Sequence, residues 1–115
     1  MNVFPLTQVL ARKVVTVPAG TTVTAVEGAD VNDASRIVGV VQSNIAVSVK
    51  IYQGSGLDPT NLEFMNATVS VTASTTEGAG SAFDFSSVGS SVRVDIVNAT
   101  EDEASVNIYV ATKGL

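Results

Sequence analysis

Residues 91–111 read SVRVDIVNATEDEASVNIYVA, and this stretch decides the fold. Two runs of apolar residues alternate one by one with polar residues: Val92, Val94 and Ile96, then Val106, Ile108 and Val110. A period of two is typical of a β-strand that buries one face. The acidic break at residues 99–103 favours solvent, so we expect it to be the loop of a β-hairpin. Two such strands need a second sheet to cover their apolar faces.

The rest of the chain has the same character. Segments of β-forming residues separated by turn signals occur at residues 14–17, 21–26, 36–42, 46–53, 67–73 and 82–85. Segment 36–42 is nearly continuously apolar, which is typical of a central strand covered on both sides. Gly39 within it predicts a bulge or a close backbone approach. About eight strands without a helical period predict an all-β protein, an antiparallel two-sheet β-sandwich.

The pattern also predicts which side chains form the core. The residues expected to point inward are Val47, Val49, Ile51, Val69, Val71, Phe83, Phe85, Val92, Val94, Ile96, Val106, Ile108 and Val110.

The chain of 115 residues is long enough for one domain, which we place at residues 14–115. Residues 1–13 mix apolar side chains with Pro5 and show no sustained period. They are interpreted as a first edge strand or as an arm that packs on a neighbouring subunit. The side chains that would make this contact are Val3, Phe4, Leu6, Val9 and Leu10.

The composition excludes several classes of function. A net charge of −5 without a Lys or Arg cluster argues against binding nucleic acid or anionic membranes. The chain has no cysteine, which mildly favours synthesis and assembly in the cytoplasm. It also has no histidine, so its serines and threonines lack the usual general base. We therefore expect no enzyme and no cofactor.

The acidic residues suggest two kinds of site, neither in a recognisable setting. Carboxylates for sugar hydrolysis are available at Asp58, Glu63, Asp84 and Asp95. Hard cations prefer oxygen clusters such as Asp30 with Asp33, or residues 101–103, but the spacing matches no calcium loop. We expect both clusters to be solvated loops and no metal to be bound.

A ligand loop is the alternative to a purely structural surface. Its side chains would be Tyr52, Asp58 and Asn61, in or beside the long loop 54–61. Tyr52 and Tyr109 point away from the valine sides of their strands, so they form an exposed patch if these strands are neighbours. Cross-strand pairing on a half-covered face is the alternative explanation for the two tyrosines.

Four segments together resemble small virion proteins of tailed phages: residues 15–21 (VTVPAGT), 36–43 (RIVGVVQS), 49–53 (VKIYQ) and 92–98 (VRVDIVN). The resemblance extends from Val14 to Val110, although the loop 57–62 lacks the tryptophan of that family. It implies a jelly-roll-like sandwich and a capsid decoration (cement) protein, made in the host cytoplasm and located on the virion surface. The implied partner is the major capsid protein.

Two further expectations accompany this hypothesis. Edge strands invite pairing, so we expect a homo-oligomer, with a trimer matching a three-fold capsid position favoured. The alternative function is a carbohydrate- or receptor-binding module of a phage tail or fibre.

Overall fold

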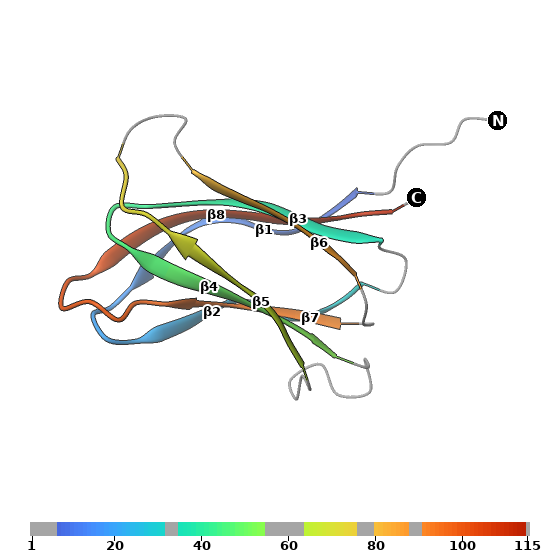
Figure 1. The fold of residues 1–115 in the computed structure, drawn as a ribbon, viewed down its shortest axis with the longest axis horizontal. Coiled ribbons are helices and arrows are strands. Elements are labelled where there is room, and N and C mark those ends of the chain that lie inside the picture. The colour runs from blue at the N-terminus through green and yellow to red at the C-terminus, as the bar shows by residue number, and fades with distance from the viewer. Residues whose placement is uncertain (1–6, 32–34, 55–63, 76–79, 88–90, 115) are drawn as a thin grey trace.

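The computed structural model describes residues 7–31, 35–54, 64–75, 80–87 and 91–114. Eight strands occur in these ranges: β1 (Thr7–Val17), β2 (Thr22–Asp30), β3 (Arg36–Ser43), β4 (Val47–Gly54), β5 (Phe64–Val71), β6 (Ser81–Ser86), β7 (Ser91–Val97) and β8 (Ala104–Lys113). They form two antiparallel four-stranded sheets that pack face to face (Figure 1). Sheet A has the order β1-β8-β3-β6, and sheet B has the order β2-β7-β4-β5. The predicted two-sheet sandwich is confirmed.

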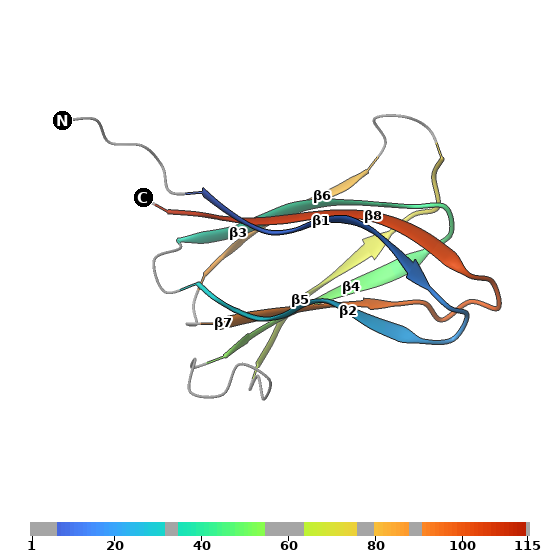
Figure 2. The same ribbon diagram turned by 180° about the vertical axis from the view of Figure 1, so that it is seen from behind.

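The strand pairs are nested around the middle of the chain. Strand β4 pairs with β5, β3 with β6, β2 with β7 and β1 with β8, all antiparallel. Two further pairings, β3 with β8 and β4 with β7, complete the sheets. Seen from behind, β1 and β8 run side by side along one sheet while β2 and β7 lie in the other (Figure 2). This is the topology of a jelly roll.

The core lies between the sheets, where the predicted apolar faces meet. All the side chains expected to point inward are buried, or in the case of Val69 and Phe85 partly buried against the core. Val94 is fully buried and lies in register with Val26 on one side and Ile51 on the other. The rings of Phe83 and Phe85 stack with centroids 5.8 Å apart. The period-two reading of the inward faces is therefore confirmed.

Gly39 allows the close approach that its position in the sequence predicted, without a bulge. The register of β3 is continuous against both β6 and β8. A Cβ atom on Gly39 would collide with the ring of Phe83 and with the carbonyl oxygen of Tyr109. The Phe83 ring thus occupies the space that a side chain at position 39 would fill.

The predicted hairpin between the last two strands is wrong. Strand β7 belongs to sheet B and β8 to sheet A, so residues 98–103 cross from one sheet to the other. Strand β2 also continues to Asp30, through residues expected to form a loop. Strand β1 begins at Thr7, so the second half of segment 1–13 is an edge strand of sheet A.

A buried asparagine holds the crossing between the sheets. The Asn98 side chain is fully buried, and its Nδ2 donates to the carbonyl oxygens of Val17 (3.0 Å) and Asp102 (2.8 Å). Its Oδ1 accepts from both the backbone N and the Oγ1 of Thr100, at 3.0 and 2.7 Å. The backbone N of Asn98 donates to Thr21 O at 2.9 Å. One side chain therefore ties the end of β1 to the loop that leads into β8.

Candidate binding surface

The outer face of sheet B is polar, and its groups bind one another. Thr24 Oγ1 donates to Asp95 Oδ1 at 2.8 Å, and Arg93 Nε lies 3.5 Å from the same oxygen. The Arg93 guanidinium also lies over the Tyr52 ring, 4.4 Å from its centroid, in cation–π geometry. Asp95 is largely buried by these neighbours. This face has the usual character of a solvated sheet surface.

The outer face of sheet A is different, because valines are exposed on it. Val14 is 66% exposed, Val40 46% and Val9 45%, and all three lie on strands of this sheet. Val40 is in register with Tyr109, and Tyr109 with Arg12. Val40 and Tyr109 thus form an apolar pair across β3 and β8, whereas Val14 on β1 is in register with the polar Asn107. We call the surface made up of Val9, Val14, Val38, Val40 and Tyr109 the valine face.

Basic residues accompany the valine face. Four of the six Lys and Arg residues lie on strands of sheet A: Arg12, Lys13, Arg36 and Lys113. The one acidic residue in the four strands is Asp84, which forms an exposed ion pair with Arg36. Within the described residues, neither Arg12 nor Lys113 has an acidic partner. In a chain of net charge −5, this sheet is locally positive.

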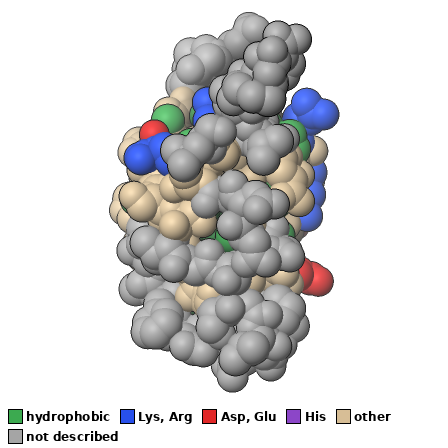
Figure 3. All heavy atoms as spheres, turned by 90° about the vertical axis from the view of Figure 1, so that its right-hand side faces the viewer, with side chains coloured by type: hydrophobic (Ala, Val, Ile, Leu, Met, Phe, Trp, Pro, Cys, Tyr) green, Lys and Arg blue, Asp and Glu red, His purple; other side chains and the backbone are tan. Residues whose placement is uncertain are grey.

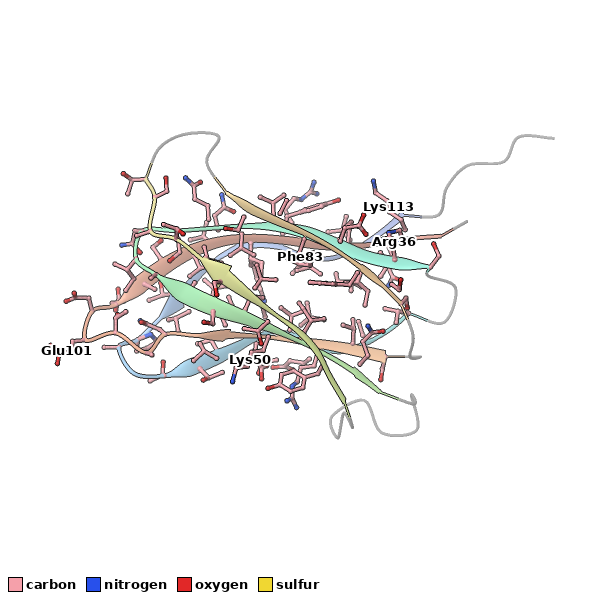
Figure 4. The ribbon with its side chains drawn as sticks, viewed as in Figure 1. Arg36, Lys50, Phe83, Glu101 and Lys113 are labelled. Atoms are coloured by element: carbon pink, nitrogen blue, oxygen red, sulfur yellow. The ribbon has the colours of Figure 1, made fainter. Side chains whose placement is uncertain are left out.

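Two of these cations are direct neighbours. Arg36 and Lys113 are in register on adjacent strands, and Figure 4 shows both at the same end of sheet A. Asp84 offsets the charge of Arg36 through their ion pair, which leaves Lys113 as the cation of this pair without an acidic partner among the described residues. Lys50 lies on the opposite outer face, and Glu101 lies at the far tip of the molecule (Figure 4). In the end view of Figure 3, most of the visible Lys and Arg side chains lie in the upper part, which contains sheet A.

A shallow hollow of about 300 Å³ lies within this surface. It is lined by Val38, Gly39, Val40, Phe83, Asp84, Tyr109 and Lys113. Its walls thus combine apolar side chains with one carboxylate and one ammonium group. This arrangement is suited to holding a projecting side chain of a partner, rather than to covalent chemistry.

The structure separates the residues of the predicted arm. Val3, Phe4 and Leu6 lie outside the described residues. Val9 is exposed on sheet A and pairs with Ala111. Leu10 lies at a β-bulge between Val9 and Ala11, and it is partly buried against the core.

The predicted ligand loop is only partly described. Asp58 and Asn61 lie outside the described residues, whereas Tyr52 lies on sheet B with one ring face under Arg93. Tyr109 lies on sheet A, so the two tyrosines are on opposite outer faces. The two tyrosines therefore do not form the exposed patch that was considered from the sequence.

The candidate carboxylates do not come together either. Asp84 lies on β6 of sheet A and Asp95 on β7 of sheet B, while Asp58 and Glu63 lie outside the described residues. Among the residues that the structure describes, no three potential ligands gather at a site for a metal ion. Residues 101–103 are exposed at the tip. In the same described ranges, no helix has the length and hydropathy needed to cross a membrane.

No protein-family model matches the sequence, and no curated protein sequence matches it. Solved structures share its fold. PirA has a TM-score of 0.53 at 10% identity, over 88% of this chain and 91% of PirA. The VP2 subviral particle of infectious bursal disease virus has a TM-score of 0.55 at 16% identity, over 96% of this chain. T=1 particles derived from the same virus have a TM-score of 0.52 at 16% identity.

These identities show a common fold alone. The alignment covers 32% of the VP2 chain, so this protein spans about a third of its length. It covers 91% of PirA. The protein is thus a jelly-roll β-sandwich that resembles, among others, a domain of a viral capsid protein.

Sequence reasoning missed most of the valine face. Val14 and Val40 were assigned to strands without an exposed role, and Arg12, Arg36 and Lys113 are too far apart in the sequence to read as a cluster. One signal was present. Segment 36–42 is apolar on both faces, although the structure covers only the face formed by Ile37, Gly39 and Val41.

Proposed function

We propose that this protein is a non-enzymatic structural protein of a virion, which decorates the outer surface of a phage capsid and stabilises it. The observation that carries the proposal is the valine face: among the described residues, the large exposed apolar side chains Val9, Val14 and Val40 all lie on the outer side of sheet A. Exposed apolar side chains that lie near one another on a small domain favour a protein–protein contact. The major capsid protein is the proposed partner, and the capsid surface the proposed location.

The fold and the sequence resemblance support this proposal. The jelly roll is shared with a viral capsid domain, and the four segments between Val15 and Asn98 resemble small virion proteins of tailed phages. The likeness to PirA at similar TM-score means that the fold alone does not fix the function. The valine face is therefore the feature to test.

The contact explains how a small protein stabilises a shell. Full burial of a valine side chain contributes about 1.5 kcal/mol or more, and these valines are already partly covered. Each copy therefore binds weakly through its apolar side chains alone. Many copies that each bridge neighbouring capsid subunits act together, because linked contacts gain avidity without new chemistry. A homo-oligomer, with a trimer favoured, would add to this effect.

The test uses capsids assembled without this protein. Purified protein is added, the capsids are sedimented, and the bound copies are counted. We expect saturable binding and a higher melting temperature of the capsid. Absence of binding at micromolar concentration, together with specific binding on a glycan array, would favour a carbohydrate-binding module instead.

A further inference from the structure

We infer that the valine face is the docking surface itself, and that its occupant is an acidic protein surface with an apolar centre on the capsid subunit. The inference rests on the proposed function and deepens it by naming the face and the chemistry of the partner. It depends on three properties of sheet A: apolar exposure, positive charge and a protected edge.

Strand β3 has the apolar pattern of a strand that is covered on both sides. It lies between β8 and β6, and its inner side is buried at Ile37 and Val41. Its outer side carries Val38 and Val40 where a solvated sheet has polar residues. Strands that are apolar on both faces normally lie between two layers. In the isolated chain the second layer is missing above Val40.

Charge decides which partner fits. Arg12 lies beside Tyr109, and Lys113 lies beside Arg36, so cations flank the apolar side chains. A second copy that used the same face would bring like charges together, which disfavours a face-to-face homodimer. An acidic partner would be attracted to sheet A. The same partner would be repelled by the acidic tip at residues 101–103, so charge also fixes the orientation of docking.

The β1 edge of sheet A is protected against the addition of a strand from a partner. Strand β1 is an outer strand with a bulge between Val9 and Ala11. Lys13 is in register with the buried Ile108, yet its side chain is exposed. Bulges and charged residues on an edge strand prevent another strand from adding to it. Strand addition at β1 is therefore disfavoured.

A footprint with single cysteines tests the face. The chain has no cysteine, so each introduced thiol is the sole target of a maleimide. Val14→Cys and Val40→Cys report on the valine face, and Ser70→Cys, exposed on sheet B, is the matched control. On capsids, we expect labelling of the two sheet A thiols to slow at least about tenfold, as for groups buried in an interface. Ser70→Cys should react at the rate of free protein.

This footprint separates the two proposals. Failure of wild-type protein to bind capsids contradicts the proposed function. If the capsid-bound protein still reacts at Val14→Cys and Val40→Cys, or is protected at Ser70→Cys instead, the docking face is overturned while the decoration function stands.

Charge reversal tests the chemistry of the partner. Arg12→Glu and Lys113→Glu should each weaken capsid binding about tenfold in low salt, and the difference from wild type should shrink at high salt. Lys50→Glu, on the other sheet, is the control and should bind as wild type does. If all three variants bind capsids as tightly as wild type does, the inference that the partner surface is acidic is overturned.

Capsid-free probes address the other occupants. Wild-type protein should bind poly-L-glutamate in low salt more tightly than single-stranded DNA or phosphatidylserine vesicles. A preference for DNA or for vesicles overturns the inference. Reversible dimerisation in analytical ultracentrifugation that Val14→Ser abolishes would make a second copy the occupant and would also overturn it.

Discussion

Replacing Gly39 by alanine is the sharpest test of how sheet A packs. The added methyl group would meet the Phe83 ring, with Cε1 at 2.8 Å and Cζ closer, and also the carbonyl oxygen of Tyr109. The ring has some freedom to shift, but the carbonyl belongs to the ladder between β3 and β8 and does not move independently. Overpacking of this kind costs about 1–3 kcal/mol. Because both obstacles act together, we expect a loss near the upper end, about 2–3 kcal/mol.

The assay is urea unfolding followed by circular dichroism, since the chain has no tryptophan. A loss of this size lowers the melting temperature of a domain of this length by roughly 8–15 °C. Gly80→Ala is the matched control, because its methyl group meets Val40 Cγ1 at 2.9 Å and that half-exposed side chain has room to rotate. Gly80→Ala should stay within about 0.5 kcal/mol of wild type. If Gly39→Ala also stays within about 0.5 kcal/mol of wild type, the close packing of Phe83 against Gly39 is refuted.

Three other changes probe the sandwich. Asn98→Ala should destabilise by about 2–4 kcal/mol in the same urea assay, because it removes the buried Nδ2 donor to the Val17 carbonyl and the Oδ1 acceptor of the Thr100 backbone N–H; a smaller loss than for Thr100→Ala would contradict the role of this side chain. Val94→Asp should prevent folding or cost several kcal/mol, since it places a carboxylate at a fully buried position, and melting near wild type would refute the register of β7. Removing residues 1–6 should leave the melting temperature unchanged, whereas removing residues 1–10 should lower it, because the ladder from Thr7 to Val9 and the packing of Leu10 are lost. Equal melting temperatures for the two truncations would contradict this pairing, and loss of capsid binding without residues 1–6 would support the arm.

The inward faces were predictable from sequence, but the strand partners were not. Alternation of Val92, Val94 and Ile96 fixes which side of β7 is buried, and the same holds for β8. It carries no information about which sheet each strand joins. At the point where the chain crosses from one sheet to the other, Asn98 makes buried hydrogen bonds that hold the crossing. In the sequence, this residue reads as an ordinary polar loop residue.

The valine face could not be predicted from the sequence for a related reason. Arg12 approaches the valines through the register of β1 on β8, and Val40 meets Tyr109 through the register of β3 on β8. These neighbours come from three distant segments, so no local pattern reveals them. The apolar run 36–42 predicted a strand covered on both sides, but among the described residues only its inner side is covered, and Val40 on the outer side is 46% exposed.

The nested strand order has a consequence for synthesis on the ribosome. Among the described strands, β1 pairs with β8, and β3 pairs with both β8 and β6, so sheet A is incomplete until β8 has been translated. Until then, Val14, Val15 and Val17 have no ladder partner, and only the β4–β5 pair is formed from neighbouring segments. Contacts between distant segments form slowly, which extends the time that such β-branched segments are open to aggregation. Sheet A is therefore completed only after β8 has left the ribosome, and the bulge and Lys13 on β1 are the features that disfavour strand addition to this segment in the meantime.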